Sequence, residues 1–435
     1  MRKLSRLFIQ NDNKVISMKF FVSASFLLTT FITGYFLPLL PVAIGVALIC
    51  LILLLFLPKH RNLKKNFYAA GAFELFTIII PSFNEGETLG KTLESLLNSD
   101  YPKNSFEIIV VYKPSEQDIK TPKLAKELTR NYRNIIFYKH YGSKAQALNY
   151  AIGKTKYDWI GLLDADNIIK KDFLSIASSY AKFCNKQKIE CFIGSYRVGN
   201  KDFNALTTLQ AIDMFQIREA VTKLGEWLGE ANFHGYNGFF KKALLQKFKF
   251  QPHHPTEDVN LSSRLMTAGI IRLHAPMLLT NYNAVASLKE LWHQRKRWAR
   301  GNCRILFEED GLGRIVKDFL PKTKLFVIIY HLYSNLSVLL LLTLVSLIGA
   351  SLTQQTVINT ILIIIFMLYI TTIASIYQNI RERTISLQDI YSILYPFFFI
   401  LCLGFIYLIG FSEEILHQRF VWVKVPERGN YERTN

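Results

Sequence analysis

Two acidic side chains follow a short apolar run near the middle of the chain. The segment 159–167 reads WIGLLDADN, which puts Asp164 and Asp166 one residue apart at the end of a predicted buried strand. Two carboxylates at positions i and i+2 can converge on one hard divalent cation, Mg²⁺ or Mn²⁺, and leave coordination positions open for phosphate oxygens. The simpler interpretation is an aspartate-rich turn.

A second pair of acids, Glu257 and Asp258, stands at the start of a helical pattern over residues 259–268. A carboxylate in this position could act as a general base that accepts a proton from a hydroxyl group. It also has an ordinary explanation, because an acid in the first turn caps a helix and pairs favourably with the helix dipole.

A basic and aromatic cluster occupies the segment 293–301, HQRKRWARG. Gln294, Arg297 and Trp298 are spaced i, i+3, i+4, so they share one side of a helix. An amide, a cation and an aromatic ring on one face suit a diphosphate group and a stacked ring. The alternative is a solvated or membrane-surface helix face.

Two loops complete the polar candidates. Pro81, Asn84 and Glu85 follow the first predicted strand, and Lys144 stands near a predicted helix start, where a phosphate binds favourably. Taken separately, these residues also fit an ordinary turn and a solvated lysine.

Alternating strand and helix patterns carry these residues. Buried strands are predicted at 75–80, 106–111, 135–138 and 159–163. Helical patterns cover 89–97, 121–132 and 143–155, and the second of them has Thr121 as its N-cap and Pro122 as its first residue. This alternation predicts a mostly parallel sheet covered on both faces, with a ligand at the carboxyl ends of the strands.

The chain as a whole is more apolar than a soluble domain. Of the 435 residues 50% are hydrophobic and 20% are charged, and the net charge is +19. Many basic residues flank apolar blocks, and no zinc-finger spacing or RNA-binding aromatic pattern accompanies them, so no nucleic acid partner is predicted. The five cysteines form no CxxC pair, which argues against a disulfide framework and a zinc site.

Five apolar segments are long enough, or nearly so, to cross a membrane as helices: 20–37, 42–57, 325–350, 357–377 and 390–411. The first two form a hairpin with basic flanks, so the positive-inside rule places the flanks and the region that follows in the cytosol. Three C-terminal spans would put the tail outside, whereas the tail is mildly basic, and its side stays open.

The order of the motifs carries a resemblance to a known family. The segments PSFNE, KAQALN, DAD, GYNGFF, TED and QRKRW follow one another between two sets of predicted spans. In this the chain resembles family 2 glycosyltransferases with a membrane-embedded GT-A domain, above all the processive synthases of cellulose, chitin, hyaluronan and poly-N-acetylglucosamine. The resemblance covers residues 73–301.

The resemblance implies a Rossmann-like α/β GT-A domain in the cytosol, embedded in an α-helical transmembrane region. We expect an N-terminal tail and transmembrane hairpin at 1–72, the GT-A domain with interfacial helices at 73–321, and a C-terminal transmembrane region and tail at 322–435. The protein is therefore expected in the cell membrane as a multi-pass protein with a cytoplasmic catalytic domain and membrane lipids around it.

The resemblance also implies a role for each candidate. Asp164 and Asp166 would hold Mg²⁺ or Mn²⁺, and Asp258 would be the catalytic base. The nucleotide-sugar donor would be bound by Pro81, Asn84, Glu85, Lys144, Asp164, Gln294, Arg297 and Trp298. The glycan or lipid acceptor would be contacted by Asn237, Gly238, Glu257 and Trp298.

The sequence departs from the family after the second strand. Members usually carry an Asp-Asp pair there that helps to hold the nucleotide base, whereas this chain has Tyr112 and Lys113. Tyr112 could stack on a base and Lys113 could meet a phosphate. Alternatively, the nucleotide is not uridine or the donor site is weakened.

The expected function is that of an inverting glycosyltransferase. It would move a sugar from a nucleotide-diphosphate sugar, UDP-linked, to a growing polysaccharide at the cytosolic membrane face, coupled to export. One alternative is the transfer of a single sugar to a membrane lipid. Another is a non-catalytic membrane protein that binds nucleotide sugar.

Overall fold

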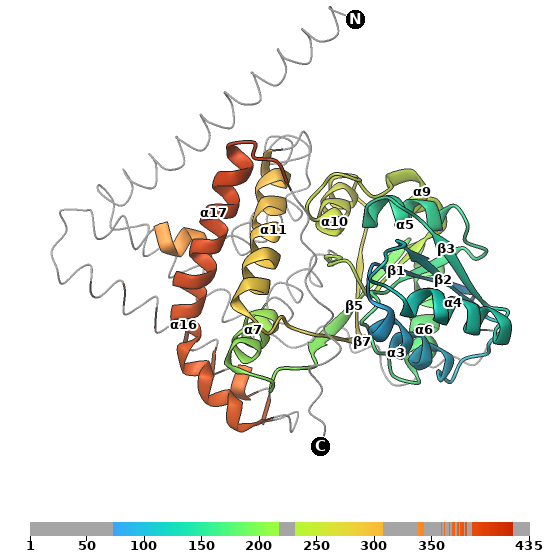
Figure 1. Ribbon diagram of the computed structural model, residues 1–435, viewed down its shortest axis with the longest axis horizontal. Helices are drawn as coiled ribbons and strands as arrows, with labels where there is room; N and C mark the ends of the chain where they lie inside the picture. The colour runs from blue at the N-terminus through green and yellow to red at the C-terminus, as the bar shows by residue number, and fades with distance from the viewer. Residues whose placement is uncertain are drawn as a thin grey trace, which may run out of the picture.

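The computed structural model describes residues 73–216, 231–307, 337–342 and 385–420, together with single residues between 358 and 380. Its main body is an α/β domain built on one sheet, and a pair of long helices lies beside that domain (Figure 1).

The sheet has seven strands in the order β3-β2-β1-β4-β6-β5-β7. The strands are β1 (Phe76–Ser82), β2 (Phe106–Tyr112), β3 (Ile135–Lys139), β4 (Trp159–Leu162), β5 (Cys191–Val198), β6 (Gly238–Lys241) and β7 (Leu273–Tyr282). Strands β1 to β4 are mutually parallel, as the sequence predicts. Strand β6 runs antiparallel to both β4 and β5, so the whole sheet is mixed.

Helices cover both faces of the sheet. They are α3 (Gly86–Leu97), α4 (Lys120–Asn131), α5 (Lys144–Ile152), α6 (Phe173–Gln187), α9 (Lys242–Phe248) and α10 (Glu257–Thr267). One apolar core joins α3, α4 and α6 to the sheet, and a second joins α5, α9 and α10 to the other face. Two packed layers of helix therefore hold the carboxyl ends of β1, β2 and β4 in a fixed arrangement.

The predicted strands agree with the structure to within two residues, but several helix ends differ. Helix α3 begins at Gly86, before the predicted start at residue 89. Helix α4 begins at Lys120 instead of Pro122, and its N-cap is Ile119 instead of Thr121. Thr121 lies in the first turn, where Asp118 Oδ1 accepts from Thr121 N at 3.0 Å and Oδ2 from the Thr121 hydroxyl at 2.8 Å. Helix α5 ends at Ile152, just before Gly153, so it is shorter than the predicted 143–155.

The described residues contain one helix that is long and apolar enough to cross a membrane, Leu387–Ile415. It comprises η3 (Leu387–Leu394), α16 (Tyr395–Phe397), η4 (Phe398–Leu403) and α17 (Gly404–Ile415). The predicted span 390–411 falls within it. The predicted spans 20–37 and 42–57 lie outside the described residues, and 325–350 and 357–377 lie largely outside them.

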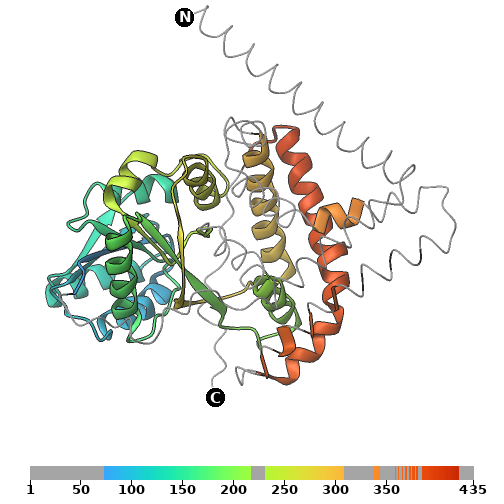
Figure 2. The same ribbon diagram turned by 180° about the vertical axis from the view of Figure 1, so that it is seen from behind.

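Helix α17 packs along α11 (Leu288–Phe307), and both views show the two helices side by side (Figure 2). Gly410 permits the close approach, because a Cβ there would lie 2.7 Å from Ala299 Cβ. Glu414, which is 5% exposed, lies 3.1 Å from Arg300 Nε and 2.6 Å from Arg304 Nε. These ion pairs fix the register of the two helices.

The substitution Glu414→Gln is expected to lower the free energy of unfolding by about 3 kcal/mol, because it leaves buried guanidinium charge without its partner. Glu413 still pairs with Arg300 at 3.2 Å, which limits the loss. Thermal unfolding in detergent measures the change. Glu94→Gln, at an exposed position of α3, is the control and should leave the transition where it is.

Candidate active site

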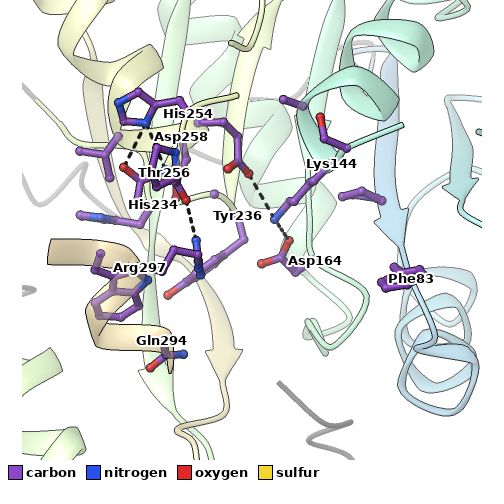
Figure 3. Close-up of a pocket in the computed structure, with 18 of the residues that line it drawn as sticks. Phe83, Lys144, Asp164, His234, Tyr236, His254, Thr256, Asp258, Gln294 and Arg297 are labelled. Carbon is purple, nitrogen blue, oxygen red and sulfur yellow. Dashed lines mark hydrogen bonds and ion pairs between the residues drawn. The ribbon is translucent and has the colours of Figure 1, made fainter. Parts of the chain in front are cut away.

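A cleft of about 1130 Å³ opens where the carboxyl ends of β1 and β4 face α10 and α11 (Figure 3). Ten of the residues that the sequence singled out line it: Pro81, Glu85, Lys144, Asp164, Asp166, Glu257, Asp258, Gln294, Arg297 and Trp298. They come from five separate stretches of chain, so the tertiary fold brings the predicted motifs to one place.

Lys144 is the central cation of the cleft. Ser143 caps α5 through a reciprocal capping box with Gln146, which fixes the helix start and the lysine beside it. Lys144 Nζ lies 2.6 Å from Asp164 Oδ1 and 4.0 Å from Glu257 Oε1. Burial alone would lower the pKa of Lys144, but the neighbouring carboxylates outweigh burial and raise it, so the ammonium stays charged.

Asp164 and Asp166 suit a divalent cation by the chemistry of their oxygens. Both line the cleft, and Asn167 braces the turn by accepting from Asp164 N at 3.0 Å and donating to Asp166 Oδ1 at 3.4 Å. Within the described chain no cluster of three or more His, Cys, Asp or Glu side chains is placed to hold a metal. Two carboxylates fit Mg²⁺ or Mn²⁺ when phosphate oxygens of a substrate complete the coordination.

Asp258 stands in the first turn of α10, after the N-cap Thr256. Burial raises the pKa of its carboxyl, while Lys144 and Arg297 oppose the rise. Burial and the negative charge of Asp258 likewise raise the pKa of Glu257. A buried carboxyl with a raised pKa is a better proton acceptor than an ordinary aspartate, which suits a general base.

Gly235 lies against the carboxylate of Asp258. Its φ is +91°, and a Cβ added there would lie 2.8 Å from Asp258 Oδ2. The position therefore admits no side chain unless the carboxylate moves. The GYNGFF segment contains this glycine, but nothing in the sequence connects it to Asp258.

Gly235→Ala is expected to lower turnover roughly 100-fold, since a displacement of about 1 Å at a reacting group costs that much. Measurement of kcat with saturating donor tests it. Gly269→Ala is the matched control: Gly269 has φ +71° and no atom within 4 Å of a Cβ, so it carries the backbone strain without the contact. Equal losses in both variants would show that strain alone is responsible.

The predicted face of α11 forms another wall of the cleft. Gln294 Nε2 donates to the Tyr282 hydroxyl at 3.1 Å, and Arg297 Nη1 donates to the Pro255 carbonyl oxygen at 3.1 Å. Trp298 packs under the Arg295 guanidinium, 4.3 Å from the ring centroid. The i, i+3, i+4 spacing thus places an amide, a cation and a ring on the cleft side of the helix.

Three predicted site residues are not part of the described cleft lining. Asn84, at φ +53°, forms the turn after β1, and its Nδ2 donates to Gln117 Oε1 at 3.3 Å. Asn237 is 1% exposed and donates to the carbonyl oxygens of Ser195 and Leu278, which joins β5 to β7. Gly238 opens the buried strand β6. Both residues therefore take part in the sheet, directly after the loop that contains Gly235.

Tyr112 and Lys113 stand where family members carry an Asp-Asp pair, and the structure places the two side chains differently. The Tyr112 ring is 4% exposed and packs edge-on against Phe137 at 6.3 Å, away from the cleft lining. Phe83 and Lys113 line the cleft instead, and Lys113 Nζ lies 5.1 Å from the Phe83 ring centroid. Phe83, which motif reasoning passed over, is an aromatic surface of the cleft on this side.

Buried aromatic and imidazole groups form the floor of the cleft. Tyr236 lies parallel to Tyr282, with ring centroids 6.0 Å apart and an interplanar angle of 9°. Burial lowers the pKa of His234 to about 4 and that of His254 to about 3, so both imidazoles are neutral near pH 7. His254 Nδ1 accepts from Thr256 N at 3.1 Å, which fixes the entry to α10.

Comparison with known proteins identifies the family of the chain. A family model described as "Glycosyltransferase like family 2" matches residues 74–301, just over half of the chain. The poly-beta-1,6-N-acetyl-D-glucosamine synthase of Staphylococcus aureus (strain COL) is 28% identical over 252 residues, 57% of this chain and 59% of that protein. The probable glycosyltransferase YdaM of Bacillus subtilis (strain 168) is 26% identical over 259 residues, 58% and 59% of the two chains. The match thus spans less than two thirds of either relative.

Among solved structures, the mannosyltransferase PcManGT from Pyrobaculum calidifontis, in complex with GDP-Man and Mn²⁺, resembles the chain with a TM-score of 0.54. The alignment covers 88% of this chain and 99% of that one at 17% sequence identity. At this identity the likeness establishes the fold, a GT-A fold with a mixed sheet.

Proposed function

The chain belongs to the family of glycosyltransferases like family 2, and from that premise we propose that it is an inverting enzyme which builds a polysaccharide at the cytosolic face of the membrane. The donor is a nucleotide-diphosphate sugar, UDP-linked, and the acceptor is the growing glycan. The observation that carries the proposal is the convergence of Lys144, Asp164, Asp258 and Arg297 in one cleft.

The donor lies along the β1, β4 and α5 side of the cleft. Phe83 and Lys113 bind the nucleoside, and Lys144 and Arg297 bind the diphosphate, since their cationic groups line the same space. Charge grows on the diphosphate as the glycosidic bond breaks, and fixed cations that already point at it stabilise that charge without reorganisation. Gln294 and Trp298 complete the donor wall on α11.

A divalent cation fits this arrangement through Asp164 and Asp166. When bound, Mg²⁺ or Mn²⁺ supplies Lewis-acid stabilisation of the departing diphosphate. The chain's own contribution is to hold the carboxylates in place: Lys144 forms an ion pair with Asp164 at 2.6 Å, and Asn167 braces the turn.

Asp258 acts as the general base. Its carboxylate accepts the proton of an acceptor hydroxyl as the hydroxyl oxygen attacks the anomeric carbon. Attack comes from the face opposite the diphosphate, so a donor with an α-linked sugar yields a β-linked product. Glu257 and Trp298 contact the acceptor, and Asn237 and Gly238 support the loop that faces it.

The C-terminal helix supports a membrane setting. Large apolar side chains of Leu387–Ile415 are exposed, including Leu387 at 93%, Ile390 at 75% and Leu401 at 54%. Lipid contact would cover them. The segments 20–37, 42–57, 325–350 and 357–377 supply the other spans of a multi-pass protein, and the spans provide the export route for the glycan.

The test uses protein purified in detergent or nanodiscs, with Mn²⁺ or Mg²⁺ and a panel of radiolabelled nucleotide sugars. UDP-linked N-acetylglucosamine comes first, because a curated relative is named for that sugar polymer. Products are sized by gel, with Asp258→Asn as the control. High-molecular-weight product from one donor is expected. Label confined to a small lipid-soluble product would favour single transfer to a lipid, and no transfer from any donor would contradict the proposal.

A further inference from the structure

Helix α11 presents a stripe of three residues to the loop that precedes Asp258. Arg297, Gly301 and Arg304 are spaced i, i+4, i+7 and therefore lie on one side of the helix. Arg297 Nη1 donates to the Pro255 carbonyl oxygen at 3.1 Å, and Arg304 Nη1 donates to the His253 carbonyl oxygen at 2.8 Å. Gly301 gives room to Thr256, with which any side chain at that position would collide.

The start of α5 also contacts this loop, from the side of the cleft where the donor is proposed to bind. The Ser143 hydroxyl, at the start of α5, donates to the Pro252 carbonyl oxygen at 3.1 Å. The loop 252–256 is thus fixed at both ends by hydrogen bonds to neighbouring helices. Asp258 follows in the first turn of α10, so the position of its carboxylate depends on these contacts.

Arg304 has a second partner, and that partner belongs to the candidate membrane helix. Arg304 Nε lies 2.6 Å from Glu414 Oε1 on α17, while Nη1 reaches the loop. A planar guanidinium can hold two partners at a fixed angle, which a lysine ammonium on a flexible stem cannot do. The position of α17 on α11 therefore sets the orientation of the Arg304 guanidinium toward the His253 carbonyl oxygen.

We propose that Arg304 is a positioning residue that ties the place of the catalytic base to the docking of the membrane helix, so that turnover requires α17 to be seated on α11. The inference rests on the proposed role of Asp258 and deepens it. It makes the catalytic domain responsive to its membrane segment through the loop that precedes Asp258.

Arg304→Gln tests this, with Lys296→Gln as the matched control. Lys296 and Arg304 both have 25% of the side chain exposed and both pair with acids of α17, Lys296 with Glu413 at 2.7 Å. In the described structure only Arg304 of the two also bonds to the loop. We expect kcat to fall roughly 10- to 100-fold in Arg304→Gln with the donor KM unchanged, and little change in Lys296→Gln.

Arg304→Lys separates charge from geometry. It keeps the cation but cannot serve both partners, so its kcat should stay close to that of Arg304→Gln. Recovery of wild-type turnover in Arg304→Lys would overturn the proposal, because a single charge would then be enough. Equal losses in Lys296→Gln and Arg304→Gln would overturn it as well, since helix docking alone would explain them.

Hydrogen exchange supplies a readout that does not depend on activity. Backbone amides of residues 253–258 should exchange faster in Arg304→Gln than in wild type and in Lys296→Gln, measured without substrate. Unchanged exchange in that segment would overturn the positioning role. If wild-type protein transfers no sugar while the exchange difference is present, the proposed function fails and the positioning contact stands.

Discussion

Asp258→Asn is expected to lower kcat by ~10²–10⁴-fold, the usual contribution of a positioned general base. The substitution keeps the size of the side chain and removes its capacity to accept a proton. Asp258 lies against Gly235, and the charges of Lys144 and Arg297 act on its carboxylate. Affinity for the nucleotide diphosphate should change little, because Lys144 and Arg297 remain.

The pH dependence of kcat/KM gives an independent check on Asp258. The active form is the carboxylate, so activity rises with pH as the proton leaves. Burial raises the pKa of both Asp258 and Glu257, and the two adjacent groups titrate together, so the acid limb should lie above the range of an ordinary aspartate. The limb should disappear from the residual activity of Asp258→Asn. An unchanged kcat or an unchanged limb in that variant would rule out Asp258 as the base.

Asp164→Asn is expected to lower transfer by on the order of 10²–10³-fold, as for loss of one preorganised electrostatic group. Two effects contribute to the lower rate of transfer. A metal site built on two carboxylates loses one of them. Lys144 also loses its partner at 2.6 Å and is left with Glu257 at 4.0 Å. The concentration of Mn²⁺ that gives half-maximal activity should rise, and excess Mn²⁺ should restore part of the rate.

The control for Asp164 is Asp172→Asn. Asp172 is exposed at the start of α6 and does not line the cleft, so its substitution changes net charge equally without touching the site. Chelation of the metal in wild-type protein should abolish transfer, and Mn²⁺ should restore it. A metal activation curve that is identical in Asp164→Asn and wild type would show that Asp164 does not hold the cation.

The positions of most functional groups along the chain were accessible from the sequence. Parallel strands end at one edge of a sheet, so Pro81, Glu85 and Asp164 had to lie close together once the strands were identified. Gln294, Arg297 and Trp298 share a helix face by their spacing alone. Local periodicity and hydrogen-bonding habits decide such features within a few residues of chain, and the capping of α5 by Ser143 is another example.

Other predictions needed contacts that local pattern does not encode. Asn84, Asn237 and Gly238 matched family motifs, yet the structure uses them to shape a turn and to join strands. The antiparallel strand β6 made the sheet mixed, because pairing between strands far apart in sequence is decided by burial and register.

The sequence by itself determined which residue types line the cleft, and in which order along the chain. Only the tertiary structure decided how those residues are held. It packs Gly235 against Asp258, turns Tyr112 into the core and brings Phe83 to the cleft. It also lets Arg304 hold both Glu414 and the loop before the base. These relations depend on distances between side chains of different secondary-structure elements, which are set by helix and sheet packing as a whole and leave no periodic trace in the sequence.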